Sequence, residues 1–291
     1  MMNLHEYMAQ LRAEIDDQLI LNQYHNSHTV TIAMRYSIEN GGKRLRPILL
    51  LMLLEAFGIP KELGMTTAVA LEMVHTYSLI HDDLPAMDDD DMRRGKPTNH
   101  KIYGEAIAIL AGDGLLTDAF NVIANDINLD VRMRLRLIRL LSASAGSCGM
   151  IEGQLLDYEA EKKEITLDEL KQIHYLKTGK LIEFACLAAG FIADPSGIYT
   201  HRLRWFSNHL GLAFQIQDDI LDVEGDTLKL GKAVGSDEAN SKCTYVSLLG
   251  LDGAKQMLNT EIDKALVELD ALPADTKMLK ELTQYVAKRD E

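Results

Sequence analysis

Cysteine is scarce in this chain of 291 residues, which contains only Cys148, Cys186 and Cys243. The count is odd and no pair has a C-x-x-C spacing, so neither a disulfide framework nor a zinc site is indicated. Free thiols are typical of proteins in a reducing compartment. We therefore expect a cytoplasmic protein.

Leader and membrane-spanning patterns are also missing. The first residues, MMNLHEYMAQLRAEIDD, meet charge early and lack an apolar stretch followed by a cleavage site, unlike a secretory signal. The longest strongly apolar run, PILLLMLLEAF, meets Glu55 after eight residues. A membrane-spanning helix needs about 20 apolar residues, so we expect no membrane span.

Positive charge is in deficit, with 30 Lys and Arg against 44 Asp and Glu and a net charge of −14. A surface this acidic repels phosphate backbones, so we expect no nucleic-acid partner. A phosphorylated small substrate would be repelled as well. Such a substrate requires metal ions or local basic residues at its site.

Strand patterns and proline are scarce, whereas helical spacing is widespread. The chain has six prolines, and none lies between Pro97 and Pro195. Apolar side chains recur at helical intervals near both ends: Tyr7, Leu11, Ile15 and Leu19, then Leu279, Leu282 and Val286. No linker or low-complexity tract divides the chain. We expect one all-α domain over residues 1–291, a bundle of ten or more helices.

One aspartate cluster lies in the stretch FQIQDDILD. Asp218 and Asp222 are four residues apart, which places them on one face of a helix with Asp219 beside them. A solvated acidic face is the alternative explanation. Because the flanking residues are apolar or amide, the pattern favours a metal site.

The other aspartate cluster, HDDLPAMDDDDMRRG, comes earlier in the chain and has a different spacing. Asp82 and Asp88 are six residues apart and would point away from each other on a regular helix. Pro85 breaks the helix at Leu84, so two extra residues can bulge out and return Asp88 to the side of Asp82 and Asp83. Carboxylate ligands of this kind suit Mg²⁺, and neither cluster matches a calcium-binding EF-hand loop.

Basic residues accompany these clusters. The motif GGKRLRP places Lys43, Arg44 and Arg46 before a helix that Pro47 can start. Further basic residues occur beside or between the clusters: Arg93, Arg94, Lys177, Lys232 and Lys242. In an acidic protein this combination predicts a diphosphate held by metal ions and by guanidinium groups.

With these motifs the sequence resembles the short-chain trans-isoprenyl diphosphate synthases, of the bacterial farnesyl diphosphate synthase type. The resemblance covers most of the chain and keeps the family's order: GGKRLRP, HDDLPAMDDDDMRRG with PTNH, GDGLL, GQLLD, KTGKLI, FQIQDDILDVEGD, GKAVGSD and KCTY. It implies a prenyltransferase that joins isopentenyl diphosphate to dimethylallyl or geranyl diphosphate, giving farnesyl diphosphate. The implied fold surrounds a deep central cavity, usually in a homodimer.

The resemblance also implies roles for individual residues. Three Mg²⁺ ions would be bound by carboxylates at Asp82, Asp83 and Asp88 and at Asp218, Asp219 and Asp222. The allylic diphosphate would contact Arg93, Lys177 and Lys232, with Lys242 near the phosphates. Isopentenyl diphosphate would contact Lys43, Arg46, His75 and Arg94. Gln215 and Thr178 would face the carbocation, so that the catalytic set is Lys177, Thr178, Gln215 and Arg93.

Product length is expected to depend on Tyr77 and Ser78. Tyr77 lies five residues before Asp82, about 7.5 Å along the same helix, so its ring can close the tunnel below the metal ions. Ser78 is small and leaves room for the chain. In the family this combination resembles enzymes that make a C15 product.

Other functions remain as alternatives. A geranylgeranyl diphosphate synthase would make a C20 product. The pair His81-Asp82 is also typical of metal-dependent phosphohydrolases, although no further set of His ligands is evident. A terpene cyclase usually replaces the cluster DDILD with a mixed Asn/Ser/Glu motif, and a non-catalytic synthase subunit often loses aspartates, whereas both clusters are intact here.

Overall fold

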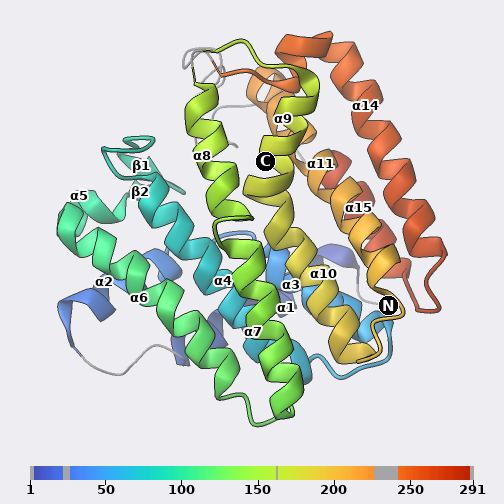
Figure 1. The fold of residues 1–291 in the computed structure, drawn as a ribbon, viewed down its shortest axis with the longest axis horizontal. Coiled ribbons are helices and arrows are strands. Elements are labelled where there is room, and N and C mark those ends of the chain that lie inside the picture. The colour runs from blue at the N-terminus through green and yellow to red at the C-terminus, as the bar shows by residue number, and fades with distance from the viewer. Residues whose placement is uncertain (1–2, 22–26, 162, 226–241, 289–291) are drawn as a thin grey trace. The chain divides into compact units, whose positions relative to one another are not determined.

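The protein is described by a computed structural model, which covers residues 3–21, 27–161, 163–225 and 242–288. These residues form more than ten α-helices and a single hairpin of two short strands (Figure 1). The predicted all-α class is confirmed.

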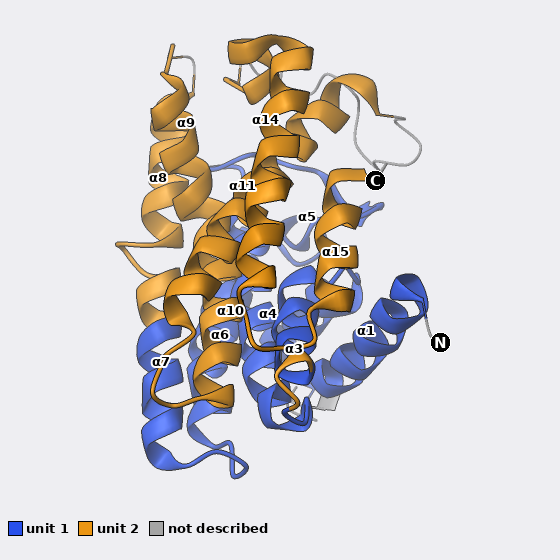
Figure 2. Cartoon of the chain, turned by 90° about the vertical axis from the view of Figure 1, so that its right-hand side faces the viewer, with its two compact units in different colours: residues 1–55, 59–141 blue, residues 56–58, 142–291 orange. Residues whose placement is uncertain are grey.

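The chain divides into two compact units, coloured separately in Figure 2. Unit 1 comprises Met1–Glu55 and Ile59–Leu141, and unit 2 comprises Ala56–Gly58 and Ser142–Glu291. Each unit packs its own apolar residues. The single domain expected over residues 1–291 stays a prediction.

Unit 1 contains most of the first half of the chain. Its elements are α1 (Leu4–Leu21), α2 (Thr29–Glu39), α3 (Leu45–Ala56), α4 (Glu62–Asp82), β1 (Met92–Arg93), β2 (Lys96–Pro97), α5 (Asn99–Tyr103), α6 (Glu105–Ala124) and most of α7 (Val131–Ala145). The periodicity predicted for α1 is confirmed, because Leu11, Ile15 and Leu19 are fully buried.

The core of unit 1 is built on α3 and α4. All residues of α3 from Pro47 to Leu54 are buried, as expected for a helix that is apolar on every side. The helix begins at Leu45, two residues before the predicted start, and Pro47 lies in its first turn, where a missing N–H removes no helical hydrogen bond. The apolar run that sequence analysis singled out is therefore a core helix.

Helix α6 packs against α4 and α2. Among the residues that the structure describes, it is the one helix with the length and mean hydropathy, 1.5, of a membrane span, but core helices meet the same criteria. Two glycines allow the close packing. A Cβ on Gly112 would lie 2.1 Å from Nε2 of His81 on α4, and one on Gly114 would lie 2.9 Å from the Met34 sulfur on α2.

Unit 2 contains the second half of the chain. Its elements are α8 (Met150–Ala160), α9 (Leu167–His174), the π-helix η1 (Tyr175–Gly179), α10 (Lys180–Ala193), α11 (Thr200–Glu224), α14 (Tyr245–Asp270) and α15 (Lys277–Lys288). A buried cluster joins α9, α11 and α14 through Leu170, Ile216, Ile220, Tyr245 and Leu258. The periodicity predicted for α15 is confirmed by the burial of Leu279, Leu282 and Val286.

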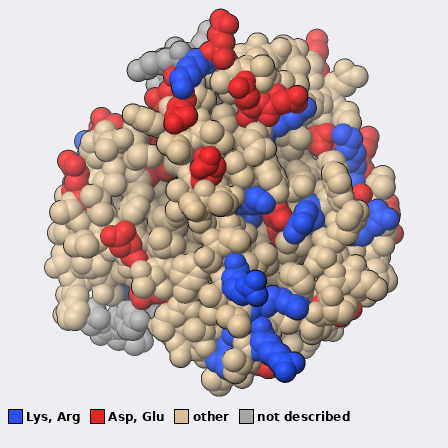
Figure 3. All heavy atoms as spheres, viewed as in Figure 1, with Lys and Arg blue, Asp and Glu red and all other residues tan. Residues whose placement is uncertain are grey.

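Charge is distributed unevenly over the surface. On the face shown in Figure 3, basic side chains gather over the lower part, where Figure 1 shows α7. Helix α7 carries four arginines in the stretch VRMRLRLIR. A protein with a net charge of −14 can thus still carry local positive patches. A site for phosphorylated substrates requires such a patch.

Candidate active site

The first aspartate cluster follows the end of α4, which stops at Asp82. Pro85 has a fixed φ and no N–H, and it disfavours a helical conformation at the residue before it, so the helix cannot continue. The backbone N–H of Asp88 donates to the carbonyl oxygen of Asp82 at 2.9 Å, and that of Asp89 donates to Leu84 at 3.1 Å. The predicted bulge is confirmed, since one hydrogen bond closes the six-residue gap.

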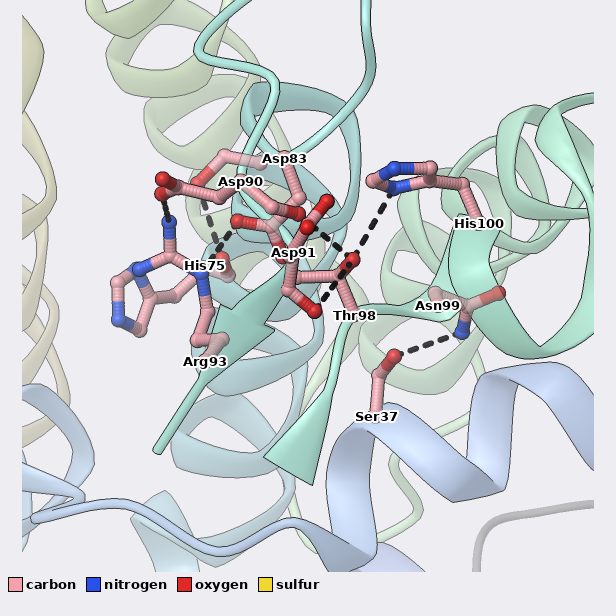
Figure 4. Close-up of polar contacts among 10 residues, drawn as sticks. Ser37, His75, Asp83, Asp90, Asp91, Arg93, Thr98, Asn99 and His100 are labelled. Carbon is pink, nitrogen blue, oxygen red and sulfur yellow. Dashed lines mark hydrogen bonds and ion pairs between the residues drawn. The ribbon is translucent and has the colours of Figure 1, made fainter. Parts of the chain in front are cut away.

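The side chain of Asp83 points to Arg93 (Figure 4). Asp83 is 3% exposed, and its Oδ1 accepts a hydrogen bond from Nε of Arg93 at 2.5 Å. Burial raises the pKa of Asp83 to about 6, even though the positive charge of Arg93 acts in the opposite direction. A second carboxylate, that of Asp90, accepts from the same guanidinium at 3.3 Å. Asp83 therefore orients an arginine as well as contributing charge to the cluster.

The residues of this cluster fit Mg²⁺ by their chemistry. In the parts of the chain that the structure describes, no three His, Cys, Asp or Glu side chains gather into a complete metal site. Mg²⁺ does not need one, because it is usually bound by one or two carboxylates and takes its other ligands from water and phosphate oxygens. Asp82 is half-buried at the helix end and Asp88 is exposed, as expected for carboxylates that bind a hydrated ion.

Unit 1 also brings together most of the basic residues predicted to bind isopentenyl diphosphate. Nη1 of Arg46 lies 3.3 Å from Nε2 of His75. Because arginine can only donate, Nε2 accepts and the imidazole proton is on Nδ1. Burial, followed by the charges of Arg46, Arg94, Arg44 and Arg93, holds the pKa of His75 well below its usual value. His75 is thus a neutral imidazole, with its proton on Nδ1, in a strongly positive environment.

Arg94 reaches this group from the β1–β2 turn. Its guanidinium donates to the carbonyl oxygen of Gly41, and a Cβ on Gly42 would lie 2.6 Å from the guanidinium carbon. Gly42 also has a φ of 142°, in the region that favours glycine. Gly42 of GGKRLRP is therefore required for the approach of Arg94, and the exposed Lys43 follows it directly.

Arg44 has a different role from its neighbours in this motif. It is 3% exposed, with a φ of 51°, and its side chain points into unit 1. Its guanidinium donates to Asp16 at 2.8 Å, to Glu72 at 2.7 Å and to the carbonyl oxygen of Ile38 at 2.6 Å. The grouping of Arg44 with the anion-binding residues was wrong, because a buried ion pair with Glu72 uses its charge.

The second aspartate cluster lies near the C-terminal end of α11 in unit 2. Asp218 and Asp222 are one turn apart on the helix, as predicted; Asp218 is half-buried and Asp222 is buried. Oδ2 of Asp219 accepts a hydrogen bond from the backbone N–H of Tyr245 at 2.7 Å, the first residue of α14. One oxygen of Asp219 is therefore used to fix the start of α14.

Lys177 and Thr178 lie in the π-helix η1, between α9 and α10. π-Helical turns are rare and frequently occur at functional sites. Nζ of Lys177 donates to Oδ2 of Asp157 on α8 at 2.5 Å. Burial tends to raise the pKa of Asp157, but the charges of Lys177 and Lys242 outweigh it and lower that pKa. Asp157 thereby orients Lys177. Lys242 is near enough for its charge to act on the same carboxylate.

Close helix packing surrounds this π-helix. A Cβ on Gly153 of α8 would lie 2.1 Å from the backbone nitrogen of Lys177, and one on Gly211 of α11 would lie 3.4 Å from the Cα of Gly179. Thr178 is buried. Gln215 is half-buried on α11, one turn before Asp218. Lys232 lies outside the described residues.

The residues predicted to set product length differ in their surroundings. Tyr77 is 5% exposed, and its ring meets the edge of His81 with a centroid distance of 5.6 Å. Burial and the charge of Asp82 raise the pKa of Tyr77 to about 12. The Ser78 hydroxyl donates to the carbonyl oxygen of His75 at 2.9 Å. Tyr77 is therefore a fixed, neutral ring within one and a half turns of Asp82.

Sequence reasoning missed two positions. Asp157 belongs to the motif GQLLD, where Gly153 and Asp157 share a helix face at a spacing of four, and that spacing was the available signal. Thr98 belongs to PTNH, and its hydroxyl donates to the carbonyl oxygen of Asp90 at 2.7 Å (Figure 4). No local pattern predicts this contact, because it depends on the path of the hairpin. The three cysteines are free, as expected.

Comparison with known proteins defines the class. The family model of polyprenyl synthetase matches residues 27–285, which is most of the chain. The chain belongs to the polyprenyl synthetase family.

Individual relatives agree with this assignment. The chain is 47% identical to farnesyl diphosphate synthase of Bacillus subtilis (strain 168), over 99% of this chain and 98% of the relative. It is 52% identical to farnesyl diphosphate synthase of Geobacillus stearothermophilus, over 89% and 88% of the two chains. A solved structure of a geranyltransferase from Helicobacter pylori, complexed with magnesium and isoprenyl diphosphate, superimposes with a TM-score of 0.85 at 33% identity, over 99% of this chain and 97% of that one.

Proposed function

We propose that this protein is a prenyltransferase that condenses isopentenyl diphosphate head to tail with dimethylallyl or geranyl diphosphate to form farnesyl diphosphate. The observation that carries the proposal is the bulge after α4. It brings Asp88 back to Asp82 and leaves Arg93 beside them, paired with Asp83. Carboxylates and a guanidinium at one helix end suit a metal-bound diphosphate.

Isopentenyl diphosphate binds, in this proposal, to Lys43, Arg46, His75 and Arg94. Arg46 and His75 are in contact, and Arg94 acts on the pKa of the same imidazole. Because His75 stays neutral, it adds no further positive charge, and its Nδ1–H is a donor for a phosphate oxygen. Three basic side chains from two motifs, together with His75 of α4, thus offset the acidic surface locally.

The allylic diphosphate binds to Arg93, Lys177, Lys232 and Lys242. Asp82, Asp88 and Asp218 would hold the metal ions, with Asp83, Asp219 and Asp222 as nearby support. When bound, Mg²⁺ supplies positive charge that stabilises the diphosphate as it leaves, and three ions are proposed by analogy with the family. The contact between Lys177 and Asp157, at 2.5 Å, keeps the ammonium group in place before substrate binds.

The chemistry follows from this arrangement. The allylic C–O bond breaks, and its electron pair leaves with the diphosphate, which Arg93 and Lys177 bind. The double bond of isopentenyl diphosphate then supplies the electrons of the new C–C bond. The hydroxyl oxygen of Thr178 and the amide oxygen of Gln215 face the cation with their dipoles. A proton is finally lost to the released diphosphate, so no protein base is required.

We propose a C15 product because Tyr77 is large, buried and fixed. Its ring contacts His81, and a Cβ at Gly112 would collide with that imidazole. The ring therefore has little freedom to move aside for a longer chain. A small residue at this position would remove the barrier and favour a C20 product.

We also propose a homodimer, in which α6 forms part of the interface. Only 33% of the apolar stretch of α6 is buried within the chain. Ile109 and Leu110 on this helix are 43% and 52% exposed. An apolar helix with this much exposed area is typical of a surface that a second copy covers. Neither a nucleic-acid partner nor a membrane span is part of the proposal.

The decisive test is incubation of the purified protein with labelled isopentenyl diphosphate, dimethylallyl diphosphate and Mg²⁺, followed by chromatography of the hydrolysed products. We expect a C15 alcohol as the main product and loss of activity with EDTA, restored by excess Mg²⁺. Elongation that persists in EDTA would contradict the metal assignment. Phosphate release without elongation would favour a phosphohydrolase. Absence of all turnover would favour a non-catalytic subunit, and a C20 product would favour a geranylgeranyl diphosphate synthase.

A further inference from the structure

The segment after the β1–β2 hairpin makes contacts on two sides. On one side it is anchored to α2. The Tyr36 hydroxyl donates to the carbonyl oxygen of Pro97 at 2.7 Å, and Nδ2 of Asn99 donates to the carbonyl oxygen of Ala33 and to the Ser37 hydroxyl, both at 2.8 Å. Asn99 is 2% exposed. The segment is therefore fixed to a helix that takes no direct part in the proposed metal site.

On its other side the same segment contacts the aspartate loop. The hydroxyl of Thr98 donates to the carbonyl oxygen of Asp90 at 2.7 Å, and its backbone N–H donates to the carbonyl oxygen of Asp91 at 3.0 Å (Figure 4). Thr98 is 2% exposed, so water competes little for either bond. Nδ1 of His100 lies 3.2 Å from the hydroxyl oxygen and can donate to it, because that oxygen has lone pairs free to accept.

The loop thus has two anchors. Near α4, Asp88 and Asp89 bond back to Asp82 and Leu84. At its far end, the loop is held by Thr98 through Asp90 and Asp91. Asp88 belongs to the first anchor and lies two residues before Asp90 in the second, and Arg93 follows the second anchor in β1, two residues after Asp91. Asp89 adopts a φ of 52°, which is unfavourable for a residue with a side chain and persists only when the surroundings hold it.

We infer that Thr98 is a positioning residue for the metal-binding loop: its hydroxyl keeps Asp88 and Arg93 in the arrangement that a Mg²⁺–diphosphate complex requires. The inference rests on the proposed function, since it concerns the same site. It assigns a role to the motif PTNH, for which no role followed from its residue types.

The test replaces Thr98 by Val, which keeps the shape and removes the hydroxyl. The probe is Mg²⁺ with inorganic diphosphate, and binding is measured by isothermal titration calorimetry. Loss of a buried hydrogen bond predicts affinity about five- to tenfold lower in T98V. Thr98→Ser retains the hydroxyl and should bind within about twofold of the parent protein. Hydrogen exchange should be faster at the amides of Asp88 and Asp89 in T98V alone.

A matched control is available in the same unit. Thr67 on α4 is fully buried, and its hydroxyl oxygen has no hydrogen-bond partner in the structure. Thr67→Val makes the same chemical change at a residue whose hydroxyl forms no hydrogen bond in the structure. The affinity for Mg²⁺–diphosphate and the hydrogen exchange of the loop amides should therefore match the parent. This control separates loss of the contact from a general effect of a threonine-to-valine change in the core.

The outcomes distinguish the two proposals. If T98V folds, as judged by circular dichroism, and binds Mg²⁺–diphosphate like the parent, the positioning role is overturned while the proposed function stands. Equal weakening in T98S, T98V and T67V also overturns it, because the hydroxyl contact is then irrelevant. A parent protein that binds no Mg²⁺–diphosphate overturns the proposed function and the inference together. Weak binding in T98V with recovery in T98S supports the positioning role. A kcat of T98V that is nearly unchanged at saturating Mg²⁺ supports it further.

Discussion

The backbone N–H of Asp88 donates to the carbonyl oxygen of Asp82 at 2.9 Å across Pro85 and the two residues after it. This bond brings the backbone of Asp88 back to Asp82, at the end of α4, in spite of the six-residue spacing. It also separates the aspartates that are placed to bind a metal ion from those that follow. Asp91, for example, forms an exposed ion pair with Lys101 at 2.6 Å.

Asp82→Asn and Asp88→Asn should each lower kcat/KM by about a hundredfold or more, because preorganised charge for the leaving group is lost. Asp91→Asn is the control, since exposed ion pairs contribute little, and it should stay within about twofold of the parent. Steady-state kinetics at several Mg²⁺ concentrations measures both. Equal losses in all three variants would show that kcat/KM depends on the total negative charge of the loop rather than on the bulge that returns Asp88 to Asp82.

Tyr77→Ala should shift the main product from C15 to C20 or longer. Removing a buried aromatic ring also lowers the free energy of unfolding, by about 3 kcal/mol, so the product must be analysed at a temperature where the variant stays folded. Tyr77→Phe keeps the ring and should keep the C15 product. An unchanged product distribution in Tyr77→Ala would show that another residue closes the tunnel.

Protonation of His174 should lower the free energy of unfolding in acid. Burial, followed by the charges of Lys177 and Lys242, lowers its pKa from 6.5 to about 4, although Asp157 acts in the opposite direction. Between these two values the unfolded chain binds a proton that the folded protein does not, so the free energy of unfolding falls as the pH falls from 6.5 to about 4. The full effect is on the order of 3 kcal/mol.

Urea unfolding at about pH 7.5 and about pH 5 measures this loss. His174→Gln has no titrating ring and can still contact the Tyr245 hydroxyl, which lies 3.3 Å from Nδ1 of His174. The variant should lose less stability over the same interval than the parent. An identical pH dependence would mean that other groups account for it.

Asp157→Asn should lower kcat by about ten- to a hundredfold, because Lys177 loses the partner that orients it and small misplacements are costly in catalysis. The pair is largely buried, with side chains 24% and 28% exposed. Glu224→Gln breaks an exposed pair with Lys255, where the side chains are 44% and 43% exposed, and should have little effect. Equal kinetics for the parent and Asp157→Asn would remove Asp157 from the site.

Replacing Ile109 and Leu110 together by Glu should convert a dimer into a monomer, because two charges would be buried at the proposed interface. Size-exclusion chromatography with light scattering gives the mass directly. Val267→Glu is the control, since Val267 is 61% exposed on α14 and contributes to no proposed interface. If the parent protein is already monomeric, α6 has another role.

Sequence analysis predicted the parts of the site that depend on local geometry. The break after α4 follows from the restricted backbone of Pro85, and the pairing of Asp218 with Asp222 follows from the helical repeat. Both rules act over a few residues and leave a visible pattern. Residues such as Thr98 and Asp157 were missed because their partners, Asp90 and Lys177, are set by packing rather than by spacing.

The sequence by itself determined the all-α class, the order of the motifs and the bulge between Asp82 and Asp88, since helical periodicity and the proline ring act within one or two turns of chain. Only the tertiary structure decided which of the neighbouring arginines forms a buried ion pair within the protein. Arg44 is buried against Glu72, 28 residues away, whereas Arg46 meets His75, 29 residues away. Adjacent arginines look alike in a sequence, and the difference arises because the backbone at Arg44 turns its side chain into the core, where an unpaired charge would be too costly to bury.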